Sequence, residues 1–240
     1  MKEKLEPLAQ RTLIIGDVHG CYEELCRLLE LTGYTPGRDR LIFVGDLVNK
    51  GPKVVETLML VRKLGAESVI GNHELALLRQ ARKSRSRVVG NADADEWIEA
   101  LDRQDPSWRS WLESWPRFLE ITVPDESGLR PYRVVHAGVA PGMACAETPE
   151  RVLTEIRTWD GSGECLYRPE DPPWFEVYEG EITVLFGHWA RRGLVWRSNA
   201  IGVDTGCVYG GSLTALVLPE RRLFQVAAQA MYRRPGTKTF

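Results

Sequence analysis

Histidine, aspartate and asparagine side chains follow short apolar runs at five glycine-marked places in this sequence. The five segments are Gly16-Asp17-Val18-His19-Gly20, Gly45-Asp46-Leu47-Val48-Asn49-Lys50-Gly51, Gly71-Asn72-His73-Glu74, His136-Ala137-Gly138 and Gly187-His188. The chain has only 4 histidines, and all of them lie in these segments. A single histidine after a strand is usually structural. Four of four, beside two aspartates and an asparagine, indicate a functional site.

These side chains are the donors with which proteins bind a pair of divalent cations. Two carboxylates, one amide oxygen and three imidazoles, with no thiolate among them, suit borderline divalent metals. Mixed sites of this kind hold two metals about 3.5–4 Å apart, bridged by a carboxylate and a hydroxide, and catalyse in-line attack at phosphorus. The residue types therefore predict a dinuclear metal centre that acts on a phosphate compound.

The elements expected around these segments bring them to one edge of a sheet. Apolar runs at 12–15, 41–44 and 68–70 predict three strands, and the residues between them have helical spacing. This order predicts parallel strands joined by right-handed crossovers. Because ligands of such sheets bind beyond the carboxyl ends of the strands, we expect the polar segments to converge there.

The rest of the chain predicts a second sheet and a helical insertion. Two short helices are expected between residues 93 and 115, and a helix through Ile156 is expected to begin with Thr148 as its N-cap. Further strands are expected at 118–123, 132–136, 182–186, 194–196, 200–203, 213–218 and 223–226. The predicted fold class is α/β, a two-sheet β-sandwich flanked by helices. We expect a single domain over residues 1–240 with a small helical insertion at about 79–117.

Composition excludes several classes of protein. The 240 residues include 31 Lys+Arg and 33 Asp+Glu, a net charge of -2, so no global positive field attracts nucleic acid or an anionic membrane. No apolar run approaches the roughly 18 residues of a membrane span. The N-terminal segment has no apolar core and carries acidic residues, so it does not resemble a signal peptide. Five scattered cysteines indicate reduced thiols. We expect a cytoplasmic protein without membrane association.

The motif series resembles the phosphoprotein phosphatase branch of the calcineurin-like metallophosphoesterases. Within that branch, Gly45–Pro52, Gly187-His188-Trp189 and Asp204-Thr205-Gly206-Cys207 resemble the ApaH and ApaH-like phosphatases. Those proteins are symmetrical diadenosine tetraphosphate hydrolases and their relatives, some of which act on mRNA caps. The resemblance spans positions 16 to 188 and implies the calcineurin-like metallophosphoesterase fold.

The resemblance also implies a role for each residue of the site. Asp17 and His19 would hold one metal with His188 beside them, Asp46 would bridge, and Asn72 and His136 would hold the second metal. A metal-bound hydroxide would be the nucleophile. His73 would be the general acid on the leaving oxygen, and Glu74 a carboxylate that steadies the ligands. Manganese is the favoured metal, with cobalt, iron, zinc and magnesium as alternatives.

The phosphate-binding residues depart from the pattern of the protein phosphatases, which have Asp-Arg where this chain has Asn49-Lys50. Lysine offers a mobile single charge that suits a longer polyphosphate, whereas an arginine fork grips one phosphoryl group. Asn49 and Lys50 are expected at the substrate phosphate. Candidates for a second phosphate-binding cation are, in order, Arg191, Arg192 and Arg157.

The predicted function is metal-dependent hydrolysis of phosphoanhydride bonds in dinucleoside polyphosphates or capped nucleotides. The same branch also allows a Ser/Thr/Tyr protein phosphatase, so capped RNA and phosphoprotein remain alternative substrates. A catalytically silent nucleotide- or RNA-binding module is an alternative of another class. No protein partner can be inferred. Trp189 could stack on a nucleobase, and the basic run from Arg79 to Arg87 could contact RNA or simply be solvated.

Overall fold

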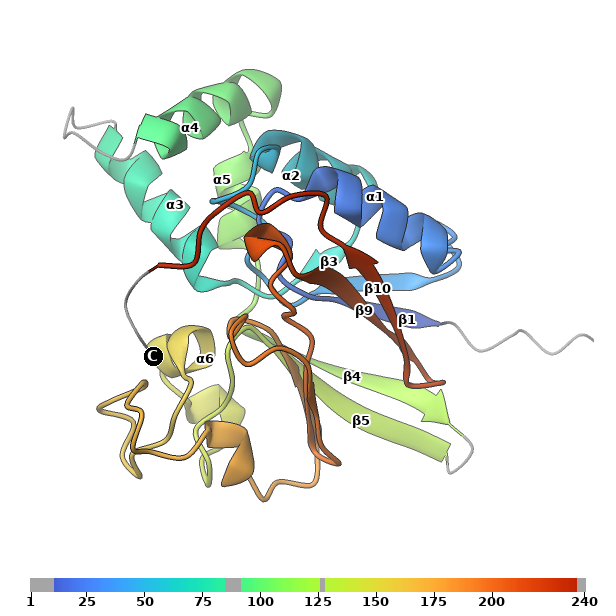
Figure 1. The fold of residues 1–240 in the computed structure, drawn as a ribbon, viewed down its shortest axis with the longest axis vertical. Coiled ribbons are helices and arrows are strands. Elements are labelled where there is room, and N and C mark those ends of the chain that lie inside the picture. The colour runs from blue at the N-terminus through green and yellow to red at the C-terminus, as the bar shows by residue number, and fades with distance from the viewer. Residues whose placement is uncertain (1–10, 85–91, 126–127, 237–240) are drawn as a thin grey trace, which may run out of the picture.

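The computed structural model describes residues 11–84, 92–125 and 128–236, which form two five-stranded sheets packed between helices (Figure 1). The first sheet has the order β10-β9-β1-β2-β3 and consists of β1 (Thr12–Ile15), β2 (Arg40–Phe43), β3 (Glu67–Ser68), β9 (Ser212–Leu218) and β10 (Arg222–Ala227). The second has the order β4-β5-β6-β8-β7 and consists of β4 (Phe118–Asp125), β5 (Gly128–Val135), β6 (Thr183–Phe186), β7 (Val195–Trp196) and β8 (Ala200–Gly202). The expected two-sheet α/β architecture is confirmed.

Parallel pairing brings the polar segments to the same end of each sheet. In the first sheet β1 pairs in parallel with β2, and β2 with β3. In the second, β5, β6 and β8 are parallel neighbours. The remaining strands are antiparallel, β9 and β10 beside β1, β4 beside β5 and β7 beside β8. The segments after β1, β2, β3, β5 and β6 can therefore meet.

The helices cover the outer faces of the sandwich. They are α1 (Tyr22–Leu31), α2 (Val54–Lys63), α3 (Asn72–Ser84), α4 (Ala92–Gln104), α5 (Trp108–Glu113) and α6 (Glu150–Glu155), with short 3₁₀ turns η1 (Cys145–Glu147), η2 (Trp174–Glu176) and η3 (Cys207–Tyr209). Helices α1 to α5 lie on the side of the first sheet and α6 on the side of the second (Figure 1). No helix in the described residues has both the length and the apolar character needed to cross a membrane.

Alternating side chains on the strands create three layers of apolar core. On β1, Leu13 and Ile15 pack with the helices, whereas Ile14 faces the second sheet and packs with Ile201 of β8. On β6, Leu185 lies between the sheets and Val184 packs in a third cluster with residues of α6. Successive strand residues point to opposite faces, and burial on both faces explains the continuous apolar runs in the sequence.

The helical segment after β3 is continuous with the main core. Residue 79, where we expected an insertion to begin, lies in the middle of α3, which starts at the site itself. Trp108 and Trp115 are buried in the same apolar cluster as α2, which favours helix packing over base stacking for these two residues. The division into one domain with an insertion remains a prediction.

The expected N-cap of α6 is wrong by one residue. Pro149 is the N-cap, and α6 begins at Glu150. The Thr148 hydroxyl instead donates to Ala144 O at 3.0 Å, closing the preceding turn η1. A threonine hydroxyl can bond forward to a helix or back to a turn, and here the local turn prevails.

Candidate active site

The polar segments predicted from the sequence meet at a pocket of about 560 Å³. From the strand-end segments, the side chains of His19, Asp46, Lys50, Asn72, His73 and His188 line its wall. Asp17, Glu74 and His136 are buried, with exposed fractions of 4%, 0% and 0%, and reach the site from the protein interior. Side chains from five separate segments are therefore brought together.

Asp46 is shared by two groups of candidate metal ligands. One group is His19, Asp46 and His73, and the other is Asp46, His136 and His188; within each, the ligand atoms lie within 4.8 Å of one another. Asp46 Oδ2 is 3.5 Å from His19 Nε2, and Oδ1 is 3.4 Å from His136 Nε2. Each oxygen thus faces a different imidazole, which supports a bridging role for Asp46.

Backbone hydrogen bonds fix the tautomers of His19 and His136. His19 Nδ1 donates to Val48 O and His136 Nδ1 to Val44 O, both at 2.8 Å. A neutral imidazole that donates from Nδ1 keeps a lone pair on Nε2. Burial lowers the pKa of both rings, which favours the neutral form that metal binding requires.

Hydrogen-bond acceptors gather around the Asn72 side chain without enough protons to satisfy them. His136 Nε2 lies 3.0 Å from Asn72 Oδ1, where neither atom has a proton to donate, and His188 Nδ1 lies 3.1 Å from the same oxygen. His188 Nε2 is buried without a hydrogen-bond partner in the structure. Unsatisfied buried acceptors are costly, and a cation among them would satisfy them. The donor set therefore fits divalent metal ions.

The side chain of His188 differs from its sequence-based expectation. It was expected beside Asp17 and His19, but it groups with Asp46 and His136. The backbone N–H of His188 is what reaches Asp17, at 3.2 Å from each carboxylate oxygen. Glycine at position 187 permits this approach, because a Cβ there would overlap the Asp17 carboxylate.

Strained backbone is concentrated in the same segments. Six non-glycine residues in the described part of the chain have φ between +47° and +69°, and five of them are His19, Asp46, Asn49, Lys50 and His188. The sixth, Arg221, lies in the β9–β10 turn. Each such residue costs on the order of 1–3 kcal/mol, so surrounding contacts must hold the loops in place.

The buried Glu74 carboxylate supplies such contacts. It accepts hydrogen bonds from the backbone N–H groups of Gly71, Asp46, Leu47 and Val48, at 3.0, 2.9, 2.8 and 3.2 Å. Burial raises the pKa of Glu74 to about 7, against the effect of these donors. Glu74 therefore acts on the site by fixing the backbone that carries Asp46.

We expect Glu74→Gln to lower the free energy of unfolding by about 3 kcal/mol. Hydrogen bonds to a charged group contribute about 1.5–3 kcal/mol and an unsatisfied buried donor costs about 1–3 kcal/mol, and the glutamine NH₂ would face backbone N–H groups. Urea denaturation measures the effect. Glu99→Gln makes the same chemical change at a side chain that is 75% exposed. Equal stability of the two variants would contradict the positioning role.

His73 is oriented by Asn49. Asn49 Nδ2 lies 2.8 Å from His73 Nδ1, and because an amide NH₂ can only donate, Nδ1 accepts and the ring proton is on Nε2. That Nε2 is 3.9 Å from Asp46 Oδ2. Burial lowers the pKa of His73 to about 4. The ring is thus a neutral proton donor at the pocket, while Asn49, expected at a substrate phosphate, does not line the pocket.

Lys50 joins the ligand groups to an aromatic wall. Its Nζ lies 2.7 Å from His19 Nε2 and 5.3 Å from the centre of the Tyr209 ring. An ammonium can only donate, so it uses the His19 lone pair that would otherwise bind a cation. Lys50 and a cation cannot use that lone pair together. A cation on His19 would therefore release Lys50 into the pocket that it lines.

A known family shares this fold and these motifs. The family model of calcineurin-like phosphoesterases matches residues 10–194. The chain belongs to this family. Family membership implies divalent metal ions, for which the two groups around Asp46 are candidate sites.

Relatives of this calcineurin-like phosphoesterase share most of its length. A symmetrical bis(5'-nucleosyl)-tetraphosphatase of Methylococcus capsulatus is 34% identical, over 85% of this chain and 90% of its own. One of Aromatoleum aromaticum is 33% identical, over 89% and 96%. The crystal structure of a candidate diadenosine tetraphosphatase superposes with a TM-score of 0.76 at 33% identity, covering 93% of this chain and 96% of that one. The resemblance to the ApaH group is confirmed.

Two of the three arginines considered from the sequence line the pocket of this phosphoesterase. Arg191 lines the pocket, but its Nη2 donates to Gly236 O at 2.6 Å. Arg192 does not line it and pairs with Glu176 at 3.0 Å. Arg157, the third candidate, lines the pocket with its guanidinium 5.1 Å from the Tyr167 ring centre. It forms no ion pair within the described residues, so its charge is available to a phosphate.

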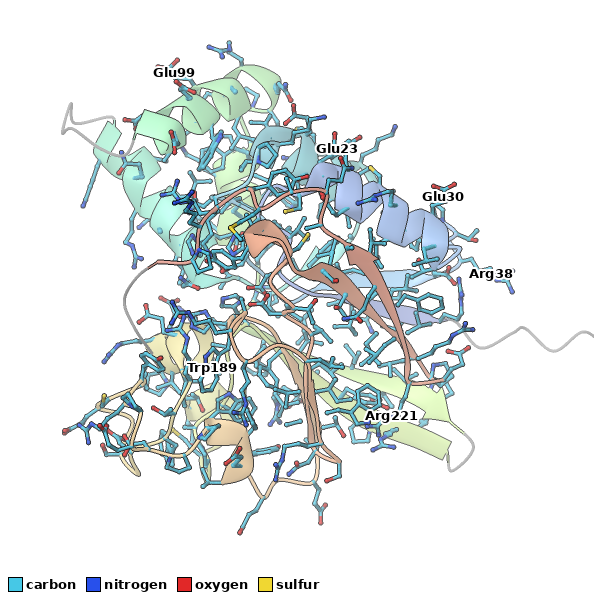
Figure 2. The ribbon with its side chains drawn as sticks, viewed as in Figure 1. Glu23, Glu30, Arg38, Glu99, Trp189 and Arg221 are labelled. Carbon is cyan, nitrogen blue, oxygen red and sulfur yellow. The ribbon has the colours of Figure 1, made fainter. Side chains whose placement is uncertain are left out.

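Aromatic side chains enter the pocket from both sheets. Tyr209 packs against the core of the first sheet and its helices, and Trp189 against the outer core of the second. Trp189 is half-buried and makes an edge contact with Tyr167, with ring centroids 6.2 Å apart. Figure 2 shows Trp189 in the half of the molecule that contains the second sheet. The Trp189 indole therefore has pocket surface available for a flat ligand.

Asp204 lies at the pocket, although it was not among the residues predicted to form the site. It lines the pocket, is 5% exposed, and its charge acts on the buried Asp17 carboxyl. Burial raises the pKa of Asp204 to about 6 and that of Asp17 well above its usual range. Two buried acids this close favour a nearby cation. The sequence did contain a pattern that could have identified this residue, because Asp204 follows an apolar strand just as Asp17 does. The segment after that strand contains no histidine, however.

The basic run from Arg79 to Arg87 does not contribute to the pocket where it is described. Arg79, Arg82 and Lys83 do not line it, and Arg82 pairs with Glu113 at 2.9 Å while 71% exposed. Arg85 and Arg87 lie outside the described residues. For the described part of the run, the solvated alternative is the better supported one.

Proposed function

We propose that this calcineurin-like phosphoesterase hydrolyses dinucleoside polyphosphates and cleaves diadenosine tetraphosphate symmetrically into two molecules of ADP. The observation that carries the proposal is one pocket that joins the ligand groups around Asp46 to three cationic side chains and to the aromatic rings of Tyr167, Trp189 and Tyr209. A dinucleoside polyphosphate has matching parts, with a polyanionic centre and a flat base at each end. The names of the relatives point the same way.

The metal ions would be held by Asp17, His19, Asp46, Asn72, His136 and His188, and we propose manganese as the native ion. When bound, such ions polarise the phosphoryl group and lower the pKa of a water to about 7. Imidazole, carboxylate and amide donors tolerate several borderline metals, and availability decides among them.

The chain's own side chains would bind the polyphosphate and assist its departure. Lys50 and Arg157 line the pocket and would offer their charges to phosphate oxygens. His73 would be the general acid in its doubly protonated form, and its neutral form, with the proton on Nε2, would donate a hydrogen bond to the oxygen that leaves. Asn49 would keep that tautomer, and Glu74 would keep Asp46 in place. Trp189 and Tyr167 would bind one base, and Tyr209 would bind the other.

A substrate panel tests the proposal. Purified protein loaded with Mn²⁺ is assayed on diadenosine tetraphosphate, a cap dinucleotide, ATP and a phosphoserine peptide, and products are separated by ion-exchange chromatography. We expect the highest kcat/KM on diadenosine tetraphosphate, with ADP as the nucleotide product. A preference for the phosphopeptide would favour a protein phosphatase. Tight binding of dinucleotide without turnover would favour a silent binding module.

Arg157→Ala should raise KM for diadenosine tetraphosphate about 10- to 100-fold, because a hydrogen bond to a charged group contributes about 1.5–3 kcal/mol. Arg192→Ala removes the same charge from a residue outside the pocket and serves as the matched control. We expect the control to stay within about twofold of wild type, since exposed ion pairs contribute about 0–1 kcal/mol. Steady-state kinetics on both variants decide the matter. A larger rise in KM for Arg192→Ala than for Arg157→Ala would instead agree with the sequence, which ranked Arg192 above Arg157.

Trp189→Ala should weaken dinucleotide binding by about 1–3 kcal/mol, which is the usual effect of removing an aromatic stacking partner from a base. Hydrolysis of a small chromogenic diester, which has no base, should hardly change. Calorimetric titration with a non-hydrolysable dinucleotide and the diester assay measure the two effects. Equal losses on both ligands would mean that Trp189 packs the site without contacting a base.

A further inference from the structure

A third group of ligand-type side chains lies outside the pocket. Cys21, Glu24 and Cys207 have ligand atoms that all lie within 4.8 Å of one another. Their exposed fractions are 0%, 0% and 1%, and none of them lines the pocket. Cys21 directly precedes α1, Glu24 is in the first turn of α1, and Cys207 begins η3. Three residues distant in sequence thus form one buried cluster.

The Glu24 carboxylate is only half satisfied. Its Oε1 accepts hydrogen bonds from the Gln229 backbone N–H and the Tyr232 hydroxyl, both at 2.8 Å. Its Oε2 is buried and has no hydrogen-bond partner in the structure. The nearby Arg27 is 45% exposed, and its Nη2 stays 3.9 Å from Oε1. A buried carboxylate oxygen without a partner is costly, and a cation is the partner that satisfies it best.

The two thiols beside Glu24 make soft ligands available. The sulfur atoms of Cys21 and Cys207 lie within 4.8 Å of each other and of a Glu24 carboxylate oxygen. Thiolates select zinc-class cations, whereas the mixed nitrogen and oxygen ligands around Asp46 also accept manganese and magnesium. The donor chemistry thus differs from that of the active site.

We propose that Cys21, Glu24 and Cys207 form a second, structural binding site for a thiophilic divalent cation of the zinc class. Binding replaces the two thiol protons, which pass to solvent, and forms two metal–sulfur bonds and one metal–oxygen bond without any redox change. The cation fastens η3 to α1. Because Cys207 follows Asp204, Thr205 and Gly206, which line the pocket, the same cation steadies one wall of the active site.

The C-terminal segment gives a route of entry to this buried site. Residues 228–236 have no helix or strand and are mostly exposed. Their hydrogen bonds to the cluster region come from Gln229 and Tyr232 to Glu24 and from Arg233 N–H to Val208 O at 3.0 Å. A few surface hydrogen bonds open locally at low cost, so the cation can enter without global unfolding.

Cobalt absorption spectroscopy tests the proposal without depending on any enzymatic activity. Reduced, metal-free protein is titrated with Co²⁺ in an Asp46→Asn background, which weakens the active-site groups. We expect one equivalent of Co²⁺ with a sulfur-to-cobalt charge-transfer band, since ligands around Asp46 contain no sulfur. Cys207→Ser and Cys21→Ser should each remove most of the band, and Glu24→Gln should weaken binding at least tenfold. Cys26→Ser and Cys165→Ser, thiols outside the cluster, should leave it unchanged.

Thermal unfolding gives a second readout on the same proteins. Zn²⁺ should raise the melting temperature of the Asp46→Asn protein and of its Cys26→Ser variant, but not that of its Cys207→Ser variant, because a ligand stabilises the state that binds it. Absence of the sulfur band in the Asp46→Asn protein, or its persistence in both Cys21→Ser and Cys207→Ser, would overturn the proposal. Since Cys21 and Cys207 are changed separately, misfolding of one variant leaves the other as the test.

Discussion

Asp46→Asn is expected to reduce kcat/KM for diadenosine tetraphosphate by at least about 10³-fold, since metal polarisation is worth several kcal/mol and each 1.36 kcal/mol is tenfold. The reason is the position of the carboxylate. Its two oxygens face His19 Nε2 at 3.5 Å and His136 Nε2 at 3.4 Å, in two separate ligand groups. An asparagine side chain keeps the shape but has one oxygen, so it can serve only one group.

Metal content should fall with activity in the Asp46→Asn variant. We expect atomic absorption to find fewer than half the Mn²⁺ ions of wild type after dialysis. EDTA should abolish wild-type activity, and Mn²⁺ or Co²⁺ should restore it better than Ca²⁺, which prefers oxygen ligands. Glu99→Gln, the same chemical change at an exposed side chain, should behave like wild type. Full activity of wild type in excess EDTA would refute the two-metal mechanism.

His73→Ala is expected to cost more on a phosphoserine peptide than on diadenosine tetraphosphate. A general acid contributes about 10²–10⁴-fold where the leaving group needs a proton, as a serine alkoxide does. A phosphate that leaves from an anhydride has a final pKa of about 6 and departs with little help. The loss on the anhydride should therefore be at least about tenfold smaller than on the peptide.

The hydrogen bond between Asn49 and His73 suggests a substitution that should strengthen the general acid instead of removing it. Asn49 Nδ2 donates to His73 Nδ1, so the ring is kept neutral with its proton on Nε2. An aspartate at position 49 would accept from Nδ1–H and stabilise the doubly protonated ring, a stronger acid in the site. We expect Asn49→Asp to raise the rate on phosphoserine peptide relative to that on diadenosine tetraphosphate.

Parallel assays of kcat/KM on both substrates for wild type, His73→Ala and Asn49→Asp measure these ratios. The Asn49→Asp variant is the matched partner, since it keeps the imidazole and changes only its hydrogen-bond partner. Identical effects of each substitution on both substrates would mean that leaving-group basicity does not govern this site. A wild-type preference for the peptide would contradict both the argument and the proposed substrate.

The sequence was sufficient to predict the architecture, because the architecture follows from local patterns. Apolar runs that end in glycine and a polar cluster identify β1, β2 and β3, and each expected strand is present with boundaries shifted by a few residues. The boundaries are less certain because turns compete locally, as Thr148 does when it bonds back to Ala144. The candidate ligands were found for a related reason: strand ends of a parallel sheet converge whatever the connecting helices are.

Only the tertiary structure showed which loop residues reach the pocket and how the side chains of the site are oriented. Arg157 and Arg192 cannot be ranked from sequence, because both lie in segments without regular spacing. Only the folded structure shows that Arg157 lines the pocket and that Arg192 pairs with Glu176. The side chain of His188 groups with Asp46 and His136 while its backbone N–H contacts Asp17, an arrangement that sequence spacing does not show.

The cluster of Cys21, Glu24 and Cys207 shows the same limit most clearly. Cys21 and Cys207 are 186 positions apart and have no metal-binding spacing, so the sequence indicated nothing more than reduced thiols. Their proximity arises because α1 and η3 both pack on the first sheet, where β9, which follows η3, pairs with β1, which precedes α1. Sequence periodicity determines which faces are buried, whereas the contacts between distant segments exist only once the sheets have formed.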